Sequence, residues 1–257
     1  MAHWELLMAL IDADELDHDE LAYRVFGVTR DKTPWRAAEI IGRGPAVRDS
    51  DRAELAWRMA SRGYYAEQAG LVAAATLAAQ TEDAPLRFSL ALATADEARH
   101  ADAFLQYARA VGGEPEPEAA EMMEPLDVAL TSLPHMGRAL VHVMLEGFAA
   151  DEFILLREVF AGDPLGQIYH HVRRDEIQHV AIGLNYLTRE SNTAAGRELW
   201  REFGPGWHET GMRLTYLDAI SLSLAELTGR EPDLVRHWFL RRHRARLRAG
   251  GVDMERR

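Results

Sequence analysis

Residues 94–104 read TADEARHADAF, and residues 173–183 read RRDEIQHVAIG. Each stretch contains a glutamate followed three residues later by a histidine: Glu97 and His100 in the first, Glu176 and His179 in the second. Residues three apart on a helix lie on one face, so both side chains of a pair can reach one metal ion. A single Glu-x-x-His match is weak evidence, because a chain with this many Glu and His residues contains about one by chance.

Two further glutamates make the pairs informative. Glu67 in GYYAEQAG lies 30 residues before Glu97, and Glu146 in VMLEGFAA lies 30 residues before Glu176. Thirty residues are enough for one helix, a tight turn, and a second helix that returns to the same level. Four glutamates and two histidines then meet between four helices, a pattern typical of di-iron and di-manganese carboxylate proteins. The predicted metal ligands, which are also the predicted catalytic residues, are Glu67, Glu97, His100, Glu146, Glu176 and His179.

Charge favours this interpretation. Four buried carboxylates carry about four negative charges, which two divalent ions neutralise and which are very costly without a cation. The alternative is a set of buried salt bridges with Arg99, Arg173 and Arg174. A third Glu-x-x-His match, Glu15 with His18, is interpreted as accidental because the chain before it is too short for a partner helix.

Apolar residues at helical spacing predict an all-α fold. We expect helices near residues 51–80, 84–112, 135–160, 163–191 and 195–228, with short loops inside two hairpins and about 20 residues between them. This arrangement predicts a ferritin-like four-helix bundle with extra N- and C-terminal helices. A shift of 79 residues places the first hairpin's ligand positions on those of the second. Residues 1–257 are predicted to form one domain, with the core bundle at 51–191, an N-terminal appendage at 1–50 and C-terminal helices at 195–250.

Composition limits the chemistry. There is no cysteine, which excludes disulfides, iron–sulfur clusters and thiolate zinc sites. The formal net charge of −12 argues against nucleic acid as a partner. No segment is long and apolar enough for a membrane span or a signal peptide, so we expect a cytoplasmic protein that does not bind membranes. One segment of this acidic chain is basic: residues 236–248 read RHWFLRRHRARLR and are predicted to form a helix. This helix either is simply solvated or docks a carrier protein, a nucleotide or another subunit.

Three residues are predicted to support the ligands. Asp96 and Asp175 each precede a ligand glutamate, and carboxylates commonly hold the free nitrogen of a ligating histidine. We expect each aspartate to support the histidine of the other hairpin, with a solvent-facing acid as the alternative. His142 lies one helical turn before Glu146 and is either an extra ligand, a hydrogen-bond donor to a ligand, or a core histidine.

With these motifs, residues 51–191 resemble the ferritin-like di-iron family. Members include bacterioferritin, rubrerythrin, the radical subunit of ribonucleotide reductase, acyl-carrier desaturases, bacterial multicomponent monooxygenases, aldehyde-deformylating oxygenases and arylamine N-oxygenases. The resemblance implies two iron ions, or a manganese and iron pair, that activate O2. It is specific for the superfamily and does not identify the reaction.

Three positions depart from particular members of the family. The radical subunit has a tyrosine four residues after its first ligand histidine, where this chain has Phe104. Monooxygenases and desaturases often have a threonine shortly after the third-helix glutamate, where residues 147–150 contain no hydroxyl. N-oxygenases have an additional histidine where this chain has Val172, and His142 is a candidate for an equivalent role.

The predicted function is therefore an O2-dependent oxidoreductase acting on a small or carrier-bound organic substrate by hydroxylation, N-oxygenation, desaturation or C–C cleavage. Electrons come from a reductase or from the substrate, and we expect a homodimer. Phe104, Ala149 and Ala150 are the predicted substrate pocket, because small residues beside Glu146 leave room there. The alternatives are a ferroxidase or a peroxide-scavenging, iron-handling protein, and a silent bundle within a complex.

Overall fold

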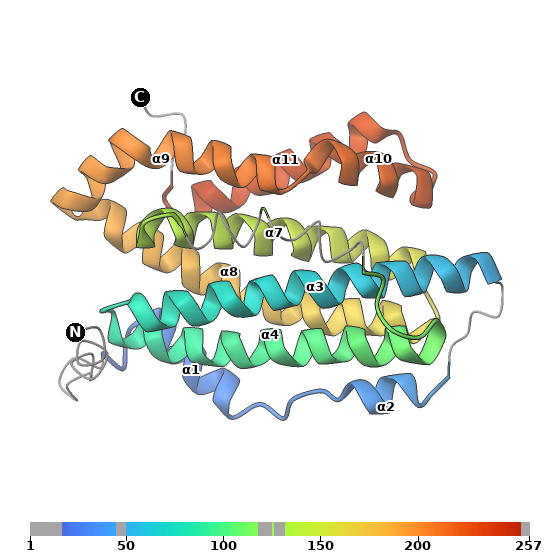
Figure 1. Cartoon of the computed structure of the whole chain (residues 1–257). Coiled ribbons are helices and arrows are strands. Elements are labelled where there is room, and N and C mark those ends of the chain that lie inside the picture. Colours follow the sequence, from blue (N-terminus) through green and yellow to red (C-terminus); the bar gives the residue numbers. More distant parts are fainter. Residues whose placement is uncertain (1–16, 45–49, 118–124, 126–131, 253–257) are drawn as a thin grey trace.

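The computed structural model describes residues 17–44, 50–117, 125 and 132–252, and the regular structure in this part of the chain is entirely helical. The helices are α1 (Leu21–Arg30), α2 (Ala37–Ile41), α3 (Ser50–Gln80), α4 (Ala84–Val111), α7 (His135–Val159), α8 (Pro164–Asn192), α9 (Ala194–Leu214), α10 (Leu217–Thr228) and α11 (Pro232–Ala249). Two antiparallel hairpins, α3 with α4 and α7 with α8, form the bundle (Figure 1). The predicted all-α, ferritin-like architecture is confirmed.

Both hairpin turns start their second helix in the same way. Asp83 caps α4, its carboxylate accepting a hydrogen bond of 2.8 Å from the backbone N–H of Leu86. Asp163 caps α8 by accepting a 2.8 Å bond from the N–H of Leu165. A proline follows each cap in the first turn, where its missing N–H costs nothing. These local signals place the starts of α4 and α8 where the sequence predicts them.

The C-terminal region differs from the prediction of one helix over 195–228. It forms two helices, α9 and α10, which are separated at Thr215 and Tyr216. Tyr216 has a left-handed backbone with φ of 46°, which ends the helical path although no glycine or proline stands there. Pro205, in contrast, lies inside α9 without ending it. The third C-terminal helix, α11, contains the predicted basic segment.

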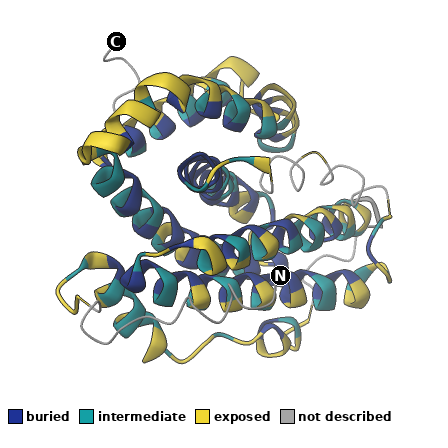
Figure 2. Ribbon diagram, turned by 60° about the vertical axis from the view of Figure 1, so that its left-hand side comes forward, coloured by how far each residue is buried: buried dark blue, intermediate teal, exposed yellow. Residues whose placement is uncertain are grey.

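These C-terminal helices cover α7. Figure 1 shows α9, α10 and α11 along the side of α7 that faces away from α3 and α4. As a result α7 is buried on nearly all sides, whereas the outer faces of the C-terminal helices are exposed (Figure 2). An ion-pair cluster fixes α11: Arg242 and Arg246 each donate a 2.6 Å hydrogen bond to Asp151 of α7, a residue that is 1% exposed. The basic helix is therefore partly a structural element and is not simply solvated.

On the other side of the bundle, α1 and α2 pack against α4 and α8 (Figure 1). They belong to the predicted N-terminal appendage. Among the described helices, none combines the length and the apolar content that crossing a membrane requires.

Candidate metal centre

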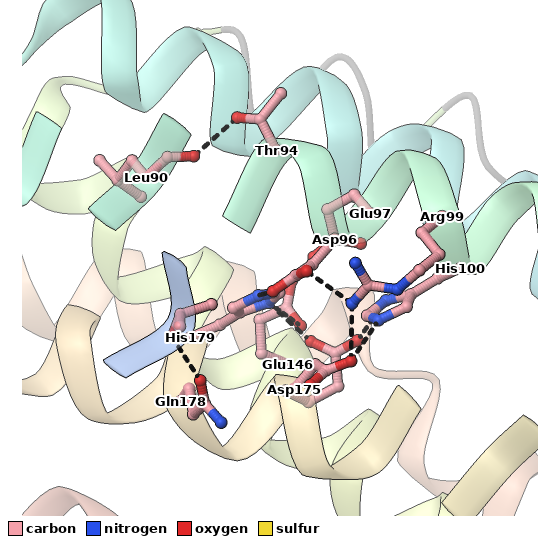
Figure 3. A network of polar contacts seen from close by, with 12 residues as sticks. Leu90, Thr94, Asp96, Glu97, Arg99, His100, Glu146, Asp175, Gln178 and His179 are labelled. Carbon is pink, nitrogen blue, oxygen red and sulfur yellow. Dashed lines mark hydrogen bonds and ion pairs between the residues drawn. The ribbon is translucent and has the colours of Figure 1, made fainter. Parts of the chain in front are cut away.

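The structure brings all six predicted ligand side chains together in the middle of the bundle. Glu67 comes from α3, Glu97 and His100 from α4, Glu146 from α7, and Glu176 and His179 from α8. Every one of them is less than a tenth exposed, and His100 is completely buried. Figure 3 shows His100, Glu146 and His179 converging on one another from different helices.

The six residues form two overlapping groups. Ligand atoms of Glu67, Glu97, His100 and Glu176 lie within 4.8 Å of one another, and so do those of Glu97, Glu146, Glu176 and His179. Glu97 and Glu176 belong to both groups. Two metal ions could therefore be held side by side, with these two carboxylates available to both.

Each histidine has its two ring nitrogens in different surroundings. His100 Nδ1 lies 3.2 Å from Glu67 and 3.1 Å from Glu176, inside the cluster. Its Nε2 lies 3.3 Å from Asp175 Oδ2, outside the cluster. A carboxylate at Nε2 favours the tautomer with the proton on that nitrogen, which leaves the Nδ1 lone pair free for a metal ion.

His179 repeats the pattern on the other hairpin. Its Nδ1 lies 2.9 Å from Glu176 and 3.0 Å from Glu97, and its Nε2 lies 3.5 Å from Asp96 Oδ2. The two aspartates thus stand opposite the histidines of the other hairpin, where the sequence analysis expected them. The contact of Asp96 is the looser one, since His179 Nε2 has no hydrogen-bond partner among the described residues.

Without a cation this cluster holds extra protons. Burial raises the pKa of Glu97, and the charge of Glu146 adds to the effect. Burial, with the charges of Glu146 and Glu97, raises the pKa of Glu176 to about 8. Burial alone would lower the pKa values of His100 and His179, but the surrounding carboxylates raise them. Divalent ions are the natural replacement for these protons, because metal ligands bind in their deprotonated form.

The donor set fits a pair of divalent ions. Four carboxylates and two imidazoles supply the oxygen and nitrogen ligands that iron and manganese accept, and two divalent charges balance four carboxylates. Glu97 Oε1 is also buried and has no hydrogen-bond partner in the described part of the chain. It lies 3.0 Å from His179 Nδ1 but is not aligned for a hydrogen bond, so the atom is left to accept a cation.

A glycine makes room for this carboxylate. A Cβ atom at Gly70 of α3 would lie 2.7 Å from Glu97 Oε2, which is closer than real Cβ contacts. Gly70 lies three residues after Glu67, so it faces the same side of α3. The absence of a side chain there lets α4 bring Glu97 into the cluster.

Sequence reasoning missed Trp35 and Lys32 as partners of Asp175, and it named Arg99 only in the salt-bridge alternative and not as a partner of the two aspartates. Arg99 donates hydrogen bonds to Asp96 and, at 2.9 Å, to Asp175, and so bridges the hairpins (Figure 3). Trp35 donates from Nε1 to Asp175 Oδ2 at 3.0 Å, and its ring stacks at 6.1 Å on His100. Lys32 adds a 3.6 Å ion pair with Asp175. Trp35 and Lys32 lie 140 or more residues from Asp175, and nothing in their local sequence indicates the contact.

His142 lies at the edge of the cluster. Its Nε2 is 3.2 Å from Glu146 Oε1 without hydrogen-bond alignment, and burial lowers its pKa, so the ring is neutral. It is close enough to be a ligand or a neighbour of one. Val172, at the position of the additional histidine in N-oxygenases, is fully buried in the apolar core.

The three residues predicted to line a substrate pocket are all at least partly buried in the structure. Phe104 is fully buried against Tyr169, Ala149 packs against the same hydrophobic core, and Ala150 is buried. The space beside Gly147 is filled by the guanidinium of Arg246, which a Cβ atom there would meet at 2.7 Å. Two small cavities do lie next to the cluster, both at His179, and none of Phe104, Ala149 and Ala150 lines either of them. Glu15 of the third Glu-x-x-His match lies outside the described residues, and His18 is exposed.

Comparisons with known proteins identify the fold. No protein-family model and no curated protein matches the sequence. Solved structures do match: a valine-to-leucine variant of an R2-like ligand-binding oxidase with an anaerobically reconstituted Mn/Fe cofactor has 17% identity and a TM-score of 0.64, covering 91% of this chain and 94% of its own. A tyrosine-to-phenylalanine variant with an aerobically reconstituted Mn/Fe cofactor has 17% identity, the same coverage and a TM-score of 0.65. The chain therefore has the ferritin-like helical fold that is also found in the R2-like ligand-binding oxidases, and it contains a buried carboxylate and histidine cluster that could bind two metal ions.

Proposed function

We propose that this protein is a non-haem di-metal oxidase or oxygenase that uses O2 to oxidise a small or carrier-bound organic substrate. The observation that carries the proposal is the cluster itself: six buried ligands in two groups that share Glu97 and Glu176. The metals would be two iron ions or a manganese and iron pair. The second choice follows the matched oxidases, which were reconstituted with Mn/Fe.

In this proposal each residue has a defined task. The four glutamates and the Nδ1 atoms of His100 and His179 hold the metals, while Asp175 and Asp96 orient the histidines from outside. When bound, two redox-active metals supply the electrons that activate O2. Burial of the ligands keeps bulk water away from this chemistry. Phe104 at the position of the radical subunit's tyrosine leaves the oxidising power for a bound substrate.

The test is anaerobic loading with Fe(II), alone or with Mn(II), followed by elemental analysis and rapid mixing with O2. We expect about two metals per chain and a transient visible absorbance whose decay the true substrate accelerates. The candidate substrates include compounds for each of four reactions: hydroxylation, N-oxygenation, desaturation and C–C cleavage. Each compound is tested with and without an added reductase. A single zinc ion, or no metal after reconstitution, would contradict the proposal at its foundation.

One observation favours the alternative of an iron-handling ferroxidase. The cavities next to His179 measure about 20 and 10 Å³, enough for O2 or water but not for an organic substrate. An oxidase must therefore open further when its substrate binds. If the protein instead oxidises Fe(II) over many cycles, accumulates ferric mineral and responds to no organic compound, the ferroxidase assignment is the correct one.

A further inference from the structure

The larger of the two cavities lies inside the bundle, between α3, α4, α7 and α8, and has a volume of about 20 Å³. At the level of the metal centre it is lined by His142 and His179, and at its other end by His135 and Tyr186. The second pair lies seven residues along α7 and α8 from the first, which is about 10 Å along a helix. The cavity therefore runs along the bundle axis, from the cluster toward the turn between α3 and α4.

Its walls are mainly hydrocarbon. Leu77, Leu86 and Leu90 line it from the first hairpin, and Ala139, Val143 and Ile182 line it from the second. All six side chains are buried. The polar side chains of the lining are confined to its two ends, with His142 and His179 at one end and His135 and Tyr186 at the other.

Size and polarity select the occupant. A stable internal water needs two to four polar partners, whereas an apolar cavity stays dry and takes up apolar gases. Ring nitrogens without a hydrogen-bond partner among the described residues lie at the ends of the cavity, on His142 and His179 at one end and on His135 at the other, whereas the middle has only hydrocarbon walls and suits an apolar gas. The volume of about 20 Å³ is above the roughly 10–15 Å³ that a cavity needs to hold one small molecule such as water, so a diatomic gas also fits. An organic substrate does not fit.

We propose that this cavity is the binding site for O2 and leads it from His135 and Tyr186 to the metal centre at His179. The inference rests on the proposed function, since it supplies the site of that function's co-substrate. His135 is only half-buried and lies at the start of α7, so it lines the outer end of the cavity near the protein surface. Ala139 lies about midway between His135 and His142 in sequence and has the smallest side chain that α7 contributes to the wall.

The test uses substitutions that fill the cavity and leave every predicted metal ligand unchanged. Ala139→Val and Ala139→Leu add increasing volume to its wall, and Ala91→Leu makes the larger change on the exposed face of α4 as a control. Crystals are pressurised with xenon, which probes apolar cavities whether or not metal is bound. In parallel, the Fe(II)-loaded proteins are mixed with O2, and Fe(II) content and melting temperature are recorded for each variant.

We expect a xenon peak between His142, His179 and Tyr186 in the wild type and in Ala91→Leu, a weaker peak in Ala139→Val and none in Ala139→Leu. The reaction with O2 should slow in the same order while the Fe(II) content stays the same. Absence of xenon from the wild-type cavity overturns the inference, and so does an unchanged O2 rate in a folded variant that excludes xenon. If Ala139→Leu does not fold, Ala139→Val decides alone. Xenon in a wild-type protein that never consumes O2 supports an apolar gas site but overturns the oxidase assignment.

Discussion

His100 Nε2 lies 3.3 Å from Oδ2 of Asp175, a residue 75 positions away on the other helical hairpin. Burial disfavours the charge of Asp175, but hydrogen bonds from His100 and Trp35 lower the pKa of this carboxyl, so it remains ionised. An ionised carboxylate at Nε2 fixes the ring with Nδ1 toward the glutamates. The two hairpins are thereby joined through the residues that would orient a metal ligand.

The contact leads to a prediction about metal affinity. Asp175→Asn keeps the shape of the side chain but removes the charge that orients His100, and we expect metal affinity to fall about 10–100-fold. Asp218→Asn is the control, because its carboxylate is 83% exposed and far along the chain from the cluster. Titration of Fe(II) under anaerobic conditions measures both. Equal metal affinities in the two variants would show that Asp175 does not orient His100 for metal binding.

Gly70 provides a second test that changes no ligand. Gly70→Ala places a methyl group 2.7 Å from Glu97 Oε2, and the carboxylate must move out of the cluster. We expect weaker metal binding with little loss of helix stability, since alanine is a better helix former than glycine. Gly206→Ala in α9 has open space around its Cβ and should leave metal binding unchanged. Unaltered binding in Gly70→Ala would mean that Glu97 does not need its present position.

Metal binding should also stabilise the fold. The buried carboxylates repel one another without a cation, so the metal-free form should melt at a lower temperature. At a hundredfold excess of metal over Kd the gain is about 3 kcal/mol. Glu146→Ala should abolish this difference, whereas Glu15→Ala, in the match interpreted as accidental, should retain it. Calorimetry with and without chelator measures the effect, and the reverse pattern would show that the wrong Glu-x-x-His pairs were assigned.

A histidine pair outside the site predicts acid sensitivity. His243 Nε2 lies 2.9 Å from His208 Nε2, and burial, with the charges of His208, Arg246 and Arg244, lowers the pKa of His243 to about 3. The folded protein therefore binds fewer protons than the unfolded chain between pH 6.5 and 3, and stability is lost as pH falls through this range. From pH 7 to 5 the loss from this residue is about 2 kcal/mol.

His243→Phe keeps an aromatic ring against Phe148 and removes the titrating group. Its unfolding free energy should fall about 2 kcal/mol less than that of the wild type between pH 7 and 5. Urea denaturation of both proteins at the two pH values gives this difference, in which the contribution of the metal cluster cancels. Equal losses would show that His243 is protonated in the folded state.

Asp151 should determine how firmly α11 is attached. Its buried carboxylate is the shared acceptor of Arg242 and Arg246, so Asp151→Asn leaves two guanidinium groups without their counter-ion. Arg242 is 39% exposed and regains water, so we expect a loss of about 2 kcal/mol, less than for a fully buried pair. Asp218→Asn, which breaks an exposed pair with Arg236, should cost less than about 1 kcal/mol. We expect faster amide hydrogen exchange in α11 of Asp151→Asn than in the wild type. Equal protection of α11 in the two proteins would argue against this anchoring.

Much of the site was predictable because its information is local. Three-residue spacing puts Glu97 with His100 and Glu176 with His179, and the 30-residue interval is the length of one hairpin. The caps at Asp83 and Asp163 begin helices whatever packs around them. Even the opposition of each aspartate to the other hairpin's histidine follows from its place one residue before a ligand glutamate.

Other features depend on which side chains meet after the helices pack. The contact of Trp35 with Asp175 joins residues 140 apart, and no periodicity encodes it. The break at Tyr216 lacks a glycine or proline, so only the path of α10 over α7 reveals it. Small residues after Glu146 suggested an open pocket, but Arg246 from α11 fills the space beside Gly147. Helical spacing determines which face of a helix a residue occupies, whereas the volume left between two packed helices depends on every side chain that enters it. For that reason the cavity at His142 and His179 was visible only in the tertiary structure.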